Sequence, residues 1–307
     1  MLPFTLQQLR ILKAIAVEKN FTKAAKELYL SQPSLSKQIK ILEKNLDILL
    51  INRENNKISL TESGQVFLEY AERILALCEE SCRTLIDIKN GERGNLTVGA
   101  SQTIGTYLMP RILALFAQTY PQINLKVEVN STRIITKDVR NREIDIAIVG
   151  GEIPTEFKAN LKIENFVEDT FRLIIPKSHP FAKKKSIPKE ALYHLNFITL
   201  NSNSTIREFI DNILTQNKID INRLKIIMQL NSIEGIKTAV SLGLGAAFVS
   251  SSAIEKEIKL KTIEIIDIEN IRITRTLFII SNRESYKSKA FQFFYNELAR
   301  LKRKIAT

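Results

Sequence analysis

The chain has 307 residues, of which 44% are hydrophobic, and it carries a formal net charge of +12. This composition excludes global disorder, and the length allows two or three domains with substantial cores. No apolar run approaches the roughly 20 residues of a membrane-spanning helix, and the N-terminus lacks a signal-peptide core. We therefore expect a soluble intracellular protein with no membrane partner. Its basic charge favours nucleic acid or another polyanion as a partner.

The first predicted elements are three helices. Apolar residues recur at helical spacing between residues 6 and 16, and a shorter stripe follows between residues 24 and 28. A break at residues 30–33 separates this second helix from a third. Ser31 can cap the third helix through its hydroxyl, and Pro33 is tolerated in the first turn, where an amide has no helical partner to lose. The spacing thus predicts two helices joined by a tight turn.

The third helix has two different faces. Its inward face is apolar and consists of Leu35, Ile39, Leu42 and Leu46. At 3.6 residues per turn, the opposite face is basic, with Ser36 beside it, and consists of Pro33, Lys37, Lys40 and Lys44. Lysines suit phosphates and short hydroxyls suit base edges, so we interpret this as a DNA-recognition helix. An ordinary solvated lysine face is the alternative, and the surrounding chain has to decide between them.

A hairpin and a long helix follow. Residues 51–61 alternate around polar side chains and predict a short wing. Thr61 then caps a helix that runs to about Asn90. Its apolar stripe, which Ser81 and Thr84 interrupt, consists of Phe67, Tyr70, Ile74, Leu77, Leu85 and Ile88. Because so long an amphipathic helix has no partner in its own small domain, we expect it to pair with the same helix of a second chain.

Two cysteines, Cys78 and Cys82, lie one turn apart on the long helix, and the only histidines are His179 and His194. Two thiols with no histidine nearby are too few for a zinc site, so we expect no metal. Small buried side chains are the favoured interpretation of the cysteines. A redox switch across a dimer interface is the alternative.

Beyond an expected linker at residues 91–94, strands and helices alternate. This pattern is typical of an α/β domain with parallel strands. A second α/β run begins near residue 169, and the last strand and helix return to the first. We therefore predict two α/β lobes joined by crossing strands, with a cleft between them.

The first ninety residues resemble the LysR-type transcriptional regulators. The resemblance lies in LQQLRILKAIAVEKNFTKAAKELYLSQPSLSKQIKILEKNLDILLINR and in ISLTESGQVFL, where helix, turn, second helix, wing and linker occur in the family's order. It implies an α/β protein with a winged helix-turn-helix at 1–61, a dimerisation helix at 62–90 and a periplasmic-binding-protein-like effector domain at 91–307. Lobe I of that domain would cover about 94–166 and 269–307, and lobe II about 167–268.

The resemblance also implies which residues contact double-stranded DNA. The family's contacting positions fall on Gln32, Pro33, Ser36 and Lys37 in the recognition helix and on Arg53 in the wing. We add Lys40 as a phosphate contact. The family further implies a homodimer that assembles into a homotetramer.

Three positions depart from the family pattern. Asp47 stands where the family usually has glycine, Ile51 where it usually has phenylalanine, and Asn55-Asn56 where the wing often has glycine and arginine. We therefore expect the wing to hold the DNA backbone less firmly than is usual in the family.

A narrower resemblance lies in the effector half, in GASQTIGTYLMPRIL, NSTRIITKDV, IDIAIVGGEIP and LNSIEGIKTAV. These segments are similar to the RuBisCO operon regulators, which are LysR-type proteins of carbon-fixation genes in bacteria, cyanobacteria and algal plastids. The heavy use of Lys, Ile and Asn is typical of AT-rich genomes. The chain is thus expected in the chloroplast stroma if its source is algal, and otherwise in the cytoplasm. A LysR-type regulator of an unrelated operon is the alternative.

Hydroxyl-rich segments mark the expected effector cleft. They follow predicted strands and begin helices, where ligands bind in open α/β sheets. The candidate residues are Ser101, Gln102, Thr103, Thr132, Arg133, Ser204 and Thr205. Such helix starts suit a carboxylate or phosphate, although each stretch alone could be only a helix cap. The carbon-fixation resemblance implies a small anionic metabolite, a sugar phosphate or NADPH.

Two other classes of protein are disfavoured. An enzyme is disfavoured because the sequence has no Walker loop, no GxSxG motif and no paired acid and base at motif spacing. We expect no catalytic residue and no cofactor. A two-lobed solute-binding protein is disfavoured by the N-terminal DNA module and by the lack of an export signal.

Overall fold

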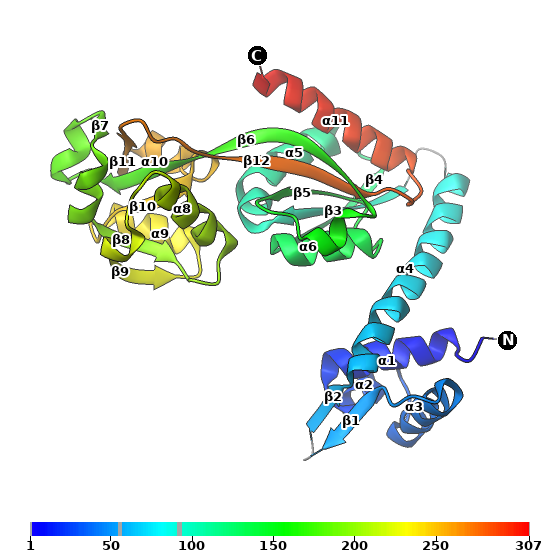
Figure 1. Cartoon of the computed structure of the whole chain (residues 1–307). Coiled ribbons are helices and arrows are strands. Elements are labelled where there is room, and N and C mark those ends of the chain that lie inside the picture. Colours follow the sequence, from blue (N-terminus) through cyan, green and yellow to red (C-terminus); the bar gives the residue numbers. More distant parts are fainter. Residues whose placement is uncertain (1, 55–56, 91–93, 307) are drawn as a thin grey trace. The chain divides into compact units, whose positions relative to one another are not determined.

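The computed structural model describes residues 2–54, 57–90 and 94–306 (Figure 1). The chain divides into two compact units, of which the first comprises residues 1–91 and 141–143 and the second the remainder. The first unit is mainly helical. It contains α1 Leu6–Glu18, α2 Phe21–Glu27, α3 Gln32–Leu46, β1 Ile51–Glu54, β2 Lys57–Leu60 and α4 Glu62–Asn90. The predicted helices and the wing are therefore present, and the wing pairs Ile51 with Leu60 in antiparallel register.

Side-chain caps explain where the short helices begin. Thr5 and Gln8 form a capping box at α1, in which each backbone amide donates to the other residue's side chain, at 2.9 and 3.2 Å. The Ser34 amide donates to Ser31 Oγ at 3.3 Å, as the sequence predicted for α3. Ala24 and Ala25 of α2 are fully or almost fully buried, because their small side chains let neighbouring helices approach closely.

Glu43 connects the recognition helix to the wing. Its side chain is buried, and Oε1 accepts the amides of Leu50 at 2.9 Å and Ile51 at 3.1 Å. A buried carboxylate that accepts two amides makes strong hydrogen bonds, so the start of β1 is held against α3. No pattern in the sequence indicated this role.

Asp47 ends α3 in the left-handed region, with φ of 53°. Glycine adopts this conformation without the steric penalty of a Cβ, whereas aspartate tolerates it at a smaller cost than most residues, which explains why the family usually has glycine there. We expect Asp47→Gly to raise the free energy of unfolding by about 0.5–1 kcal/mol, since relief of strain exceeds the added entropy of the unfolded chain. Urea unfolding would measure this. Asp47→Ala keeps the Cβ and should give no gain; an equal gain would assign the effect to the carboxylate instead of the backbone.

The second unit is built on one mixed sheet with strand order β4-β3-β5-β12-β6-β11-β7, to which β10 adds through β6. Its strands are β3 Gly94–Ser101, β4 Ile123–Asn130, β5 Ile146–Gly150, β6 Leu161–Pro176, β7 Ser186–Ile187, β10 Ala247–Ser250, β11 Ile263–Ile268 and β12 Ile273–Asn282. A separate parallel pair consists of β8 Asn196–Leu200 and β9 Lys225–Leu230. The first three strands are parallel, as predicted, whereas β12 pairs antiparallel with both β5 and β6.

Helices cover both faces of the sheet in lobe I, the right-hand lobe of Figure 1. Helices α5 Met109–Thr119 and α11 Lys289–Ala306 share one core, in which Phe116 and Phe294 are fully buried and meet edge to face. Helix α6 Thr132–Arg140 and the short α7 Thr155–Lys158 pack on the other face. Before α5, residues Ile104–Leu108 form a π-helical turn, η1. Such turns occur frequently at functional sites.

Lobe II contains the remaining helices. They are η2 Pro180–Lys183, η3 Lys189–His194, α8 Thr205–Gln216, η4 Ile221–Arg223, α9 Ile233–Ser241, η5 Ser251–Ala253 and α10 Glu255–Leu260. Strands β6 and β12 run from one lobe into the other (Figure 1). The boundary that we expected at residue 166 lies inside β6, one of the two strands that cross between the lobes.

Polar contacts also tie the two lobes together. Tyr107 of η1 donates its hydroxyl to Glu234 Oε1 of α9 at 2.7 Å, and Arg111 pairs with Glu255. Burial is the main cause that raises the pKa of Tyr107, with Glu234 adding to it, so the hydroxyl stays protonated and can donate. None of the helices in the described part of the chain combines the length and apolar character needed to cross a membrane.

Candidate DNA-binding surface and effector site

The recognition helix α3 has the orientation that its sequence pattern predicted. Leu35, Ile39 and Leu42 are fully buried. Among the predicted DNA-facing residues of α3, Ser36 is half-buried and the others are exposed: Gln32, Pro33, Lys37 and Lys40. The first half of α3 therefore has a basic face that is exposed to solvent. Arg53 belongs to β1, but its side chain, like the wing tip at 55–56, lies outside the described residues.

The apolar stripe of α4 differs from the one predicted. Phe67 and Ile74 pack beside Leu9 of α1 in the same chain, so the helix does have a partner in its own domain. The apolar side chains that remain at least half exposed on one face are Val66, Tyr70, Leu77 and Ile88. At 100° per residue these four fall within a sector of about 40°. We call this set the α4 stripe.

The two cysteines do not match the expectation of small buried side chains. Cys82 is exposed and Cys78 is half-buried, and both are free thiols. The contacts that bury α4 against α1 involve Phe67, Ala71, Ile74 and Leu75, which precede both cysteines. Among the described residues, no group of three or more His, Cys, Asp or Glu side chains is placed to hold a metal ion.

A polar cavity of about 330 Å³ lies between the two lobes of the second unit. It collects the carboxyl ends of five parallel strands, where ligands bind in open α/β folds. Its lining is Ser101, Gln102, Thr103, Asn130, Ser131, Thr132, Gly150, Asn201, Asn203, Ser204, Thr205, Ile206, Asn231 and Arg275. Six of the seven predicted effector residues are therefore brought together.

Arg133, the seventh, does not line the cavity. It pairs with Glu156 at 2.9 Å and lies over the Phe157 ring, with its side chain largely exposed. The prediction was wrong at this residue because successive residues of a helix point in different directions, and here Thr132 faces the cavity while Arg133 turns toward Glu156.

The cavity's cation is Arg275 of β12, which was not among the residues predicted from the sequence. Its side chain is 5% exposed, and it pairs with Asp169 of β6 through Nε at 3.0 Å and Nη2 at 2.9 Å. Burial lowers the pKa of Arg275, and Asp169 opposes that shift, so the guanidinium remains charged. The available signal was that Arg275 is the single charged residue of its strand, ITRTLFIISN.

The hydroxyls of the lining differ in what they can do. Thr132 donates to the Gly150 carbonyl at 2.8 Å, which leaves it able only to accept from a ligand. Ser204 begins α8 without making a side-chain cap within the described chain. Thr103 Oγ1 is buried and has no hydrogen-bond partner among the described residues. Helix capping therefore does not account for Thr103 or Ser204.

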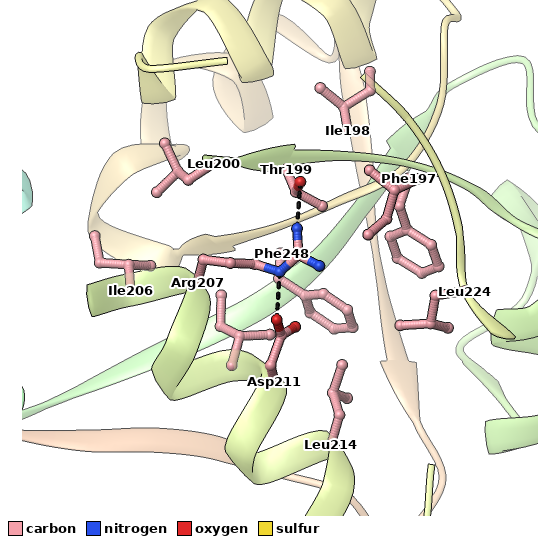
Figure 2. Close-up of a pocket in the computed structure, with 12 residues that line it drawn as sticks. Phe197, Ile198, Thr199, Leu200, Ile206, Arg207, Asp211, Leu214, Leu224 and Phe248 are labelled. Atoms are coloured by element: carbon pink, nitrogen blue, oxygen red, sulfur yellow. Dashed lines mark hydrogen bonds and ion pairs between the residues drawn. The ribbon is translucent and has the colours of Figure 1, made fainter. Parts of the chain in front are cut away.

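A smaller pocket lies in lobe II beside α8 (Figure 2). Its volume is about 30 Å³, room for about two water molecules and too little for a metabolite. Arg207 lies along its wall and donates to Asp211 Oδ2 and to Thr199 Oγ1, both at 2.6 Å. Arg207 thus turns away from the main cavity, and its charge is compensated.

A winged helix-turn-helix with a basic face, joined to two lobes around a polar cavity, defines a DNA-binding protein with a receptor domain for a small ligand. Comparison with known families agrees. The bacterial regulatory helix-turn-helix of the lysR family matches residues 6–65, and the LysR substrate binding domain matches residues 89–302. The chain belongs to the LysR family and is a LysR-type transcriptional regulator.

Individual relatives extend this result. A protein of Phaeodactylum tricornutum named "Probable RuBisCO transcriptional regulator" is 81% identical over 305 residues, 99% of each chain. A full-length OxyR variant from Pseudomonas aeruginosa is similar in structure, with a TM-score of 0.71, 25% identity and coverage of 97% and 95% of the two chains. The regulatory domain of Synechocystis PCC6803 CcmR, solved in complex with 2-PG, has a TM-score of 0.61 and 27% identity, covering 69% of this chain and 99% of its own.

Proposed function

We propose that this regulator controls RuBisCO operon genes in the chloroplast stroma, without catalysing a reaction, in response to a small anionic metabolite. The observation that carries the target gene is the 81% identity, along the whole chain, to a protein named as a RuBisCO transcriptional regulator. Gel shifts would test this with DNA from upstream of the organism's RuBisCO operon and a control fragment of equal AT content. Equal affinity for both fragments would reject the target.

We also propose that DNA is bound by a dimer joined through the α4 stripe, with two dimers forming a tetramer. Exposed apolar residues aligned on one side of a 29-residue helix support a second copy as the partner. The exposed α3 face would supply the base and phosphate contacts through Gln32, Pro33, Ser36, Lys37 and Lys40, and the wing would add Arg53.

For the effector, the polar cavity supports a compact sugar phosphate over NADPH. Its volume lies at the lower end of the range for small-molecule sites, which suits a molecule smaller than a dinucleotide. Three helix starts, at Gln102, Thr132 and Thr205, border it and favour negative charge. The similar CcmR domain is known with the small metabolite 2-PG.

Ribulose bisphosphate or a related sugar phosphate is expected to raise the melting temperature of the full chain. A ligand at a hundred times its Kd stabilises the folded state by about 2.7 kcal/mol. Thr103→Val should abolish the rise, because the cavity loses a hydroxyl while its volume is kept. The variant should not be less stable without ligand, since Thr103 Oγ1 has no partner to lose among the described residues. A full ligand shift in Thr103→Val would exclude this hydroxyl from the site.

A further inference from the structure

Arg275 is the only charged side chain among the described residues that line the polar cavity. The remaining polar groups are amides and hydroxyls, four of them asparagines. A ligand anion that enters the cavity can therefore meet a cationic side chain at one place alone, and Asp169, which pairs with that cation, does not itself line the cavity. That place lies on β12, one of the two strands that cross between the lobes.

The guanidinium is held on several sides. Asp169 pairs with Nε and Nη2, and the Phe171 ring lies 4.9 Å from Cζ. Asp169 is itself buried and accepts a hydrogen bond from Ser250. These contacts fix the plane of the guanidinium before any ligand arrives, which reduces the entropy lost on binding.

One part of the guanidinium is unsatisfied. Nη2 is buried and, although it lies close to Asp169, has no hydrogen bond of acceptable geometry within the described chain. Thr103 Oγ1, in the same lining, is also buried without a partner. Leaving buried donors unpaired is costly, so an acceptor that reaches both groups would recover that free energy.

We propose that Arg275 anchors the effector through one oxyanion, a carboxylate or a phosphate, carried by a compact hydroxylated acid. This proposal rests on the ligand-responsive function proposed above and names the chemistry of that same cavity. Thr103 adds a hydrogen bond to the anchored oxyanion. The asparagine side chains bind hydroxyls on the rest of the molecule, because an amide both donates and accepts.

Gly150 keeps the space that the anchor needs. A Cβ at this position would lie 2.9 Å from Arg275 Cζ and 3.0 Å from Nε, closer than real contacts allow. Leu277 Cδ2 would lie equally close, at 2.9 Å, so the guanidinium and Leu277 together favour glycine at this carboxyl end of β5. The approach places Arg275 beside the end of a lobe I strand, where a ligand would bridge the lobes.

The proposal is tested by calorimetry and melting shifts on the full chain with glycerate, glycerol 3-phosphate and inorganic phosphate, and with erythritol as a neutral hydroxylated control. We expect glycerate or glycerol 3-phosphate to bind. The ligand with the higher affinity shows whether the anchored oxyanion is a carboxylate or a phosphate. Erythritol should not bind. Binding of erythritol with neither acid binding overturns the proposal, as does failure of all three anions to bind.

Variants then isolate the anchor. Arg275→Lys keeps the charge but loses the planar fork, and should weaken the acid's binding at least tenfold. Arg275→Gln alone would leave the charge of the buried Asp169 without a cationic partner, so it is combined with Asp169→Asn. We expect this double variant to fold and to bind the acid about a hundredfold more weakly than the unaltered protein does. The matched control is Arg207→Lys, which changes a paired arginine of the smaller pocket. This variant should bind the acid as tightly as the unaltered protein does.

Unchanged acid binding in both Arg275 variants overturns the anchor. Selective gel shifts on the RuBisCO operon fragment would then still support the proposed target, so the two failures are distinguishable. Loss of acid binding in Arg207→Lys to the same extent as in Arg275→Lys would also overturn it, because the effect would not be specific to the cavity.

Discussion

Replacing Ser36 and Lys37 together by alanine is expected to weaken binding to operator DNA by about 1–3 kcal/mol for each base that these side chains recognise. Lys37 is exposed on the face of α3 opposite the buried Leu35 and Ile39, and Ser36 lies half-buried beside that face. Neither supports the core, so the free energy of unfolding should stay nearly unchanged. Gel shifts with operator and non-operator fragments, together with urea unfolding, would measure both effects.

The matched control is the removal of a lysine one or two turns further along the same face. Lys40→Ala or Lys44→Ala should weaken all DNA sequences alike and reduce the slope of log K against log salt by about 1, because one phosphate is no longer neutralised. Measurements at two salt concentrations separate the two kinds of effect. Unchanged operator binding by the Ser36/Lys37 double variant would mean that α3 does not read the groove.

Aspartates at Leu77 and Ile88 are expected to convert the dimer into monomers. Both side chains are at least half exposed on the α4 stripe, 50% and 62%, so the substitutions leave the chain's own core intact. In a dimer, four carboxylates would be buried in an apolar seam, and both desolvation and like-charge repulsion oppose that. Affinity for paired half-sites should fall with the dimer. Light scattering would report the mass.

Ile86→Asp is the control for this experiment. Ile86 is 51% exposed, much like Leu77, but lies on the opposite side of α4. It should leave the dimer intact. Ile74, although part of the stripe predicted from sequence, is unsuitable because it packs near Leu9 of its own chain. A dimer that survives both aspartates would place the interface elsewhere in the protein.

One difference between the predicted and observed effector site is the place of Arg133. Thr132 and Arg133 were assigned together because they are adjacent in the sequence and begin a helix. Adjacent helical residues diverge by about 100°, and in this helix Thr132 reaches the cavity. Arg133 meets Glu156 instead.

The sequence by itself determined the winged helix-turn-helix, the long α4 helix and the strand ends that carry Ser101, Thr132 and Ser204. These features depend on periodicity, caps and short-range order, which a single segment contains. Only the tertiary structure decided which face of α4 stays exposed and which cation serves the cavity. Arg275 and Asp169 are 106 residues apart. Their pairing exists because two strands cross between the lobes, and the pattern of neither strand alone reveals the other.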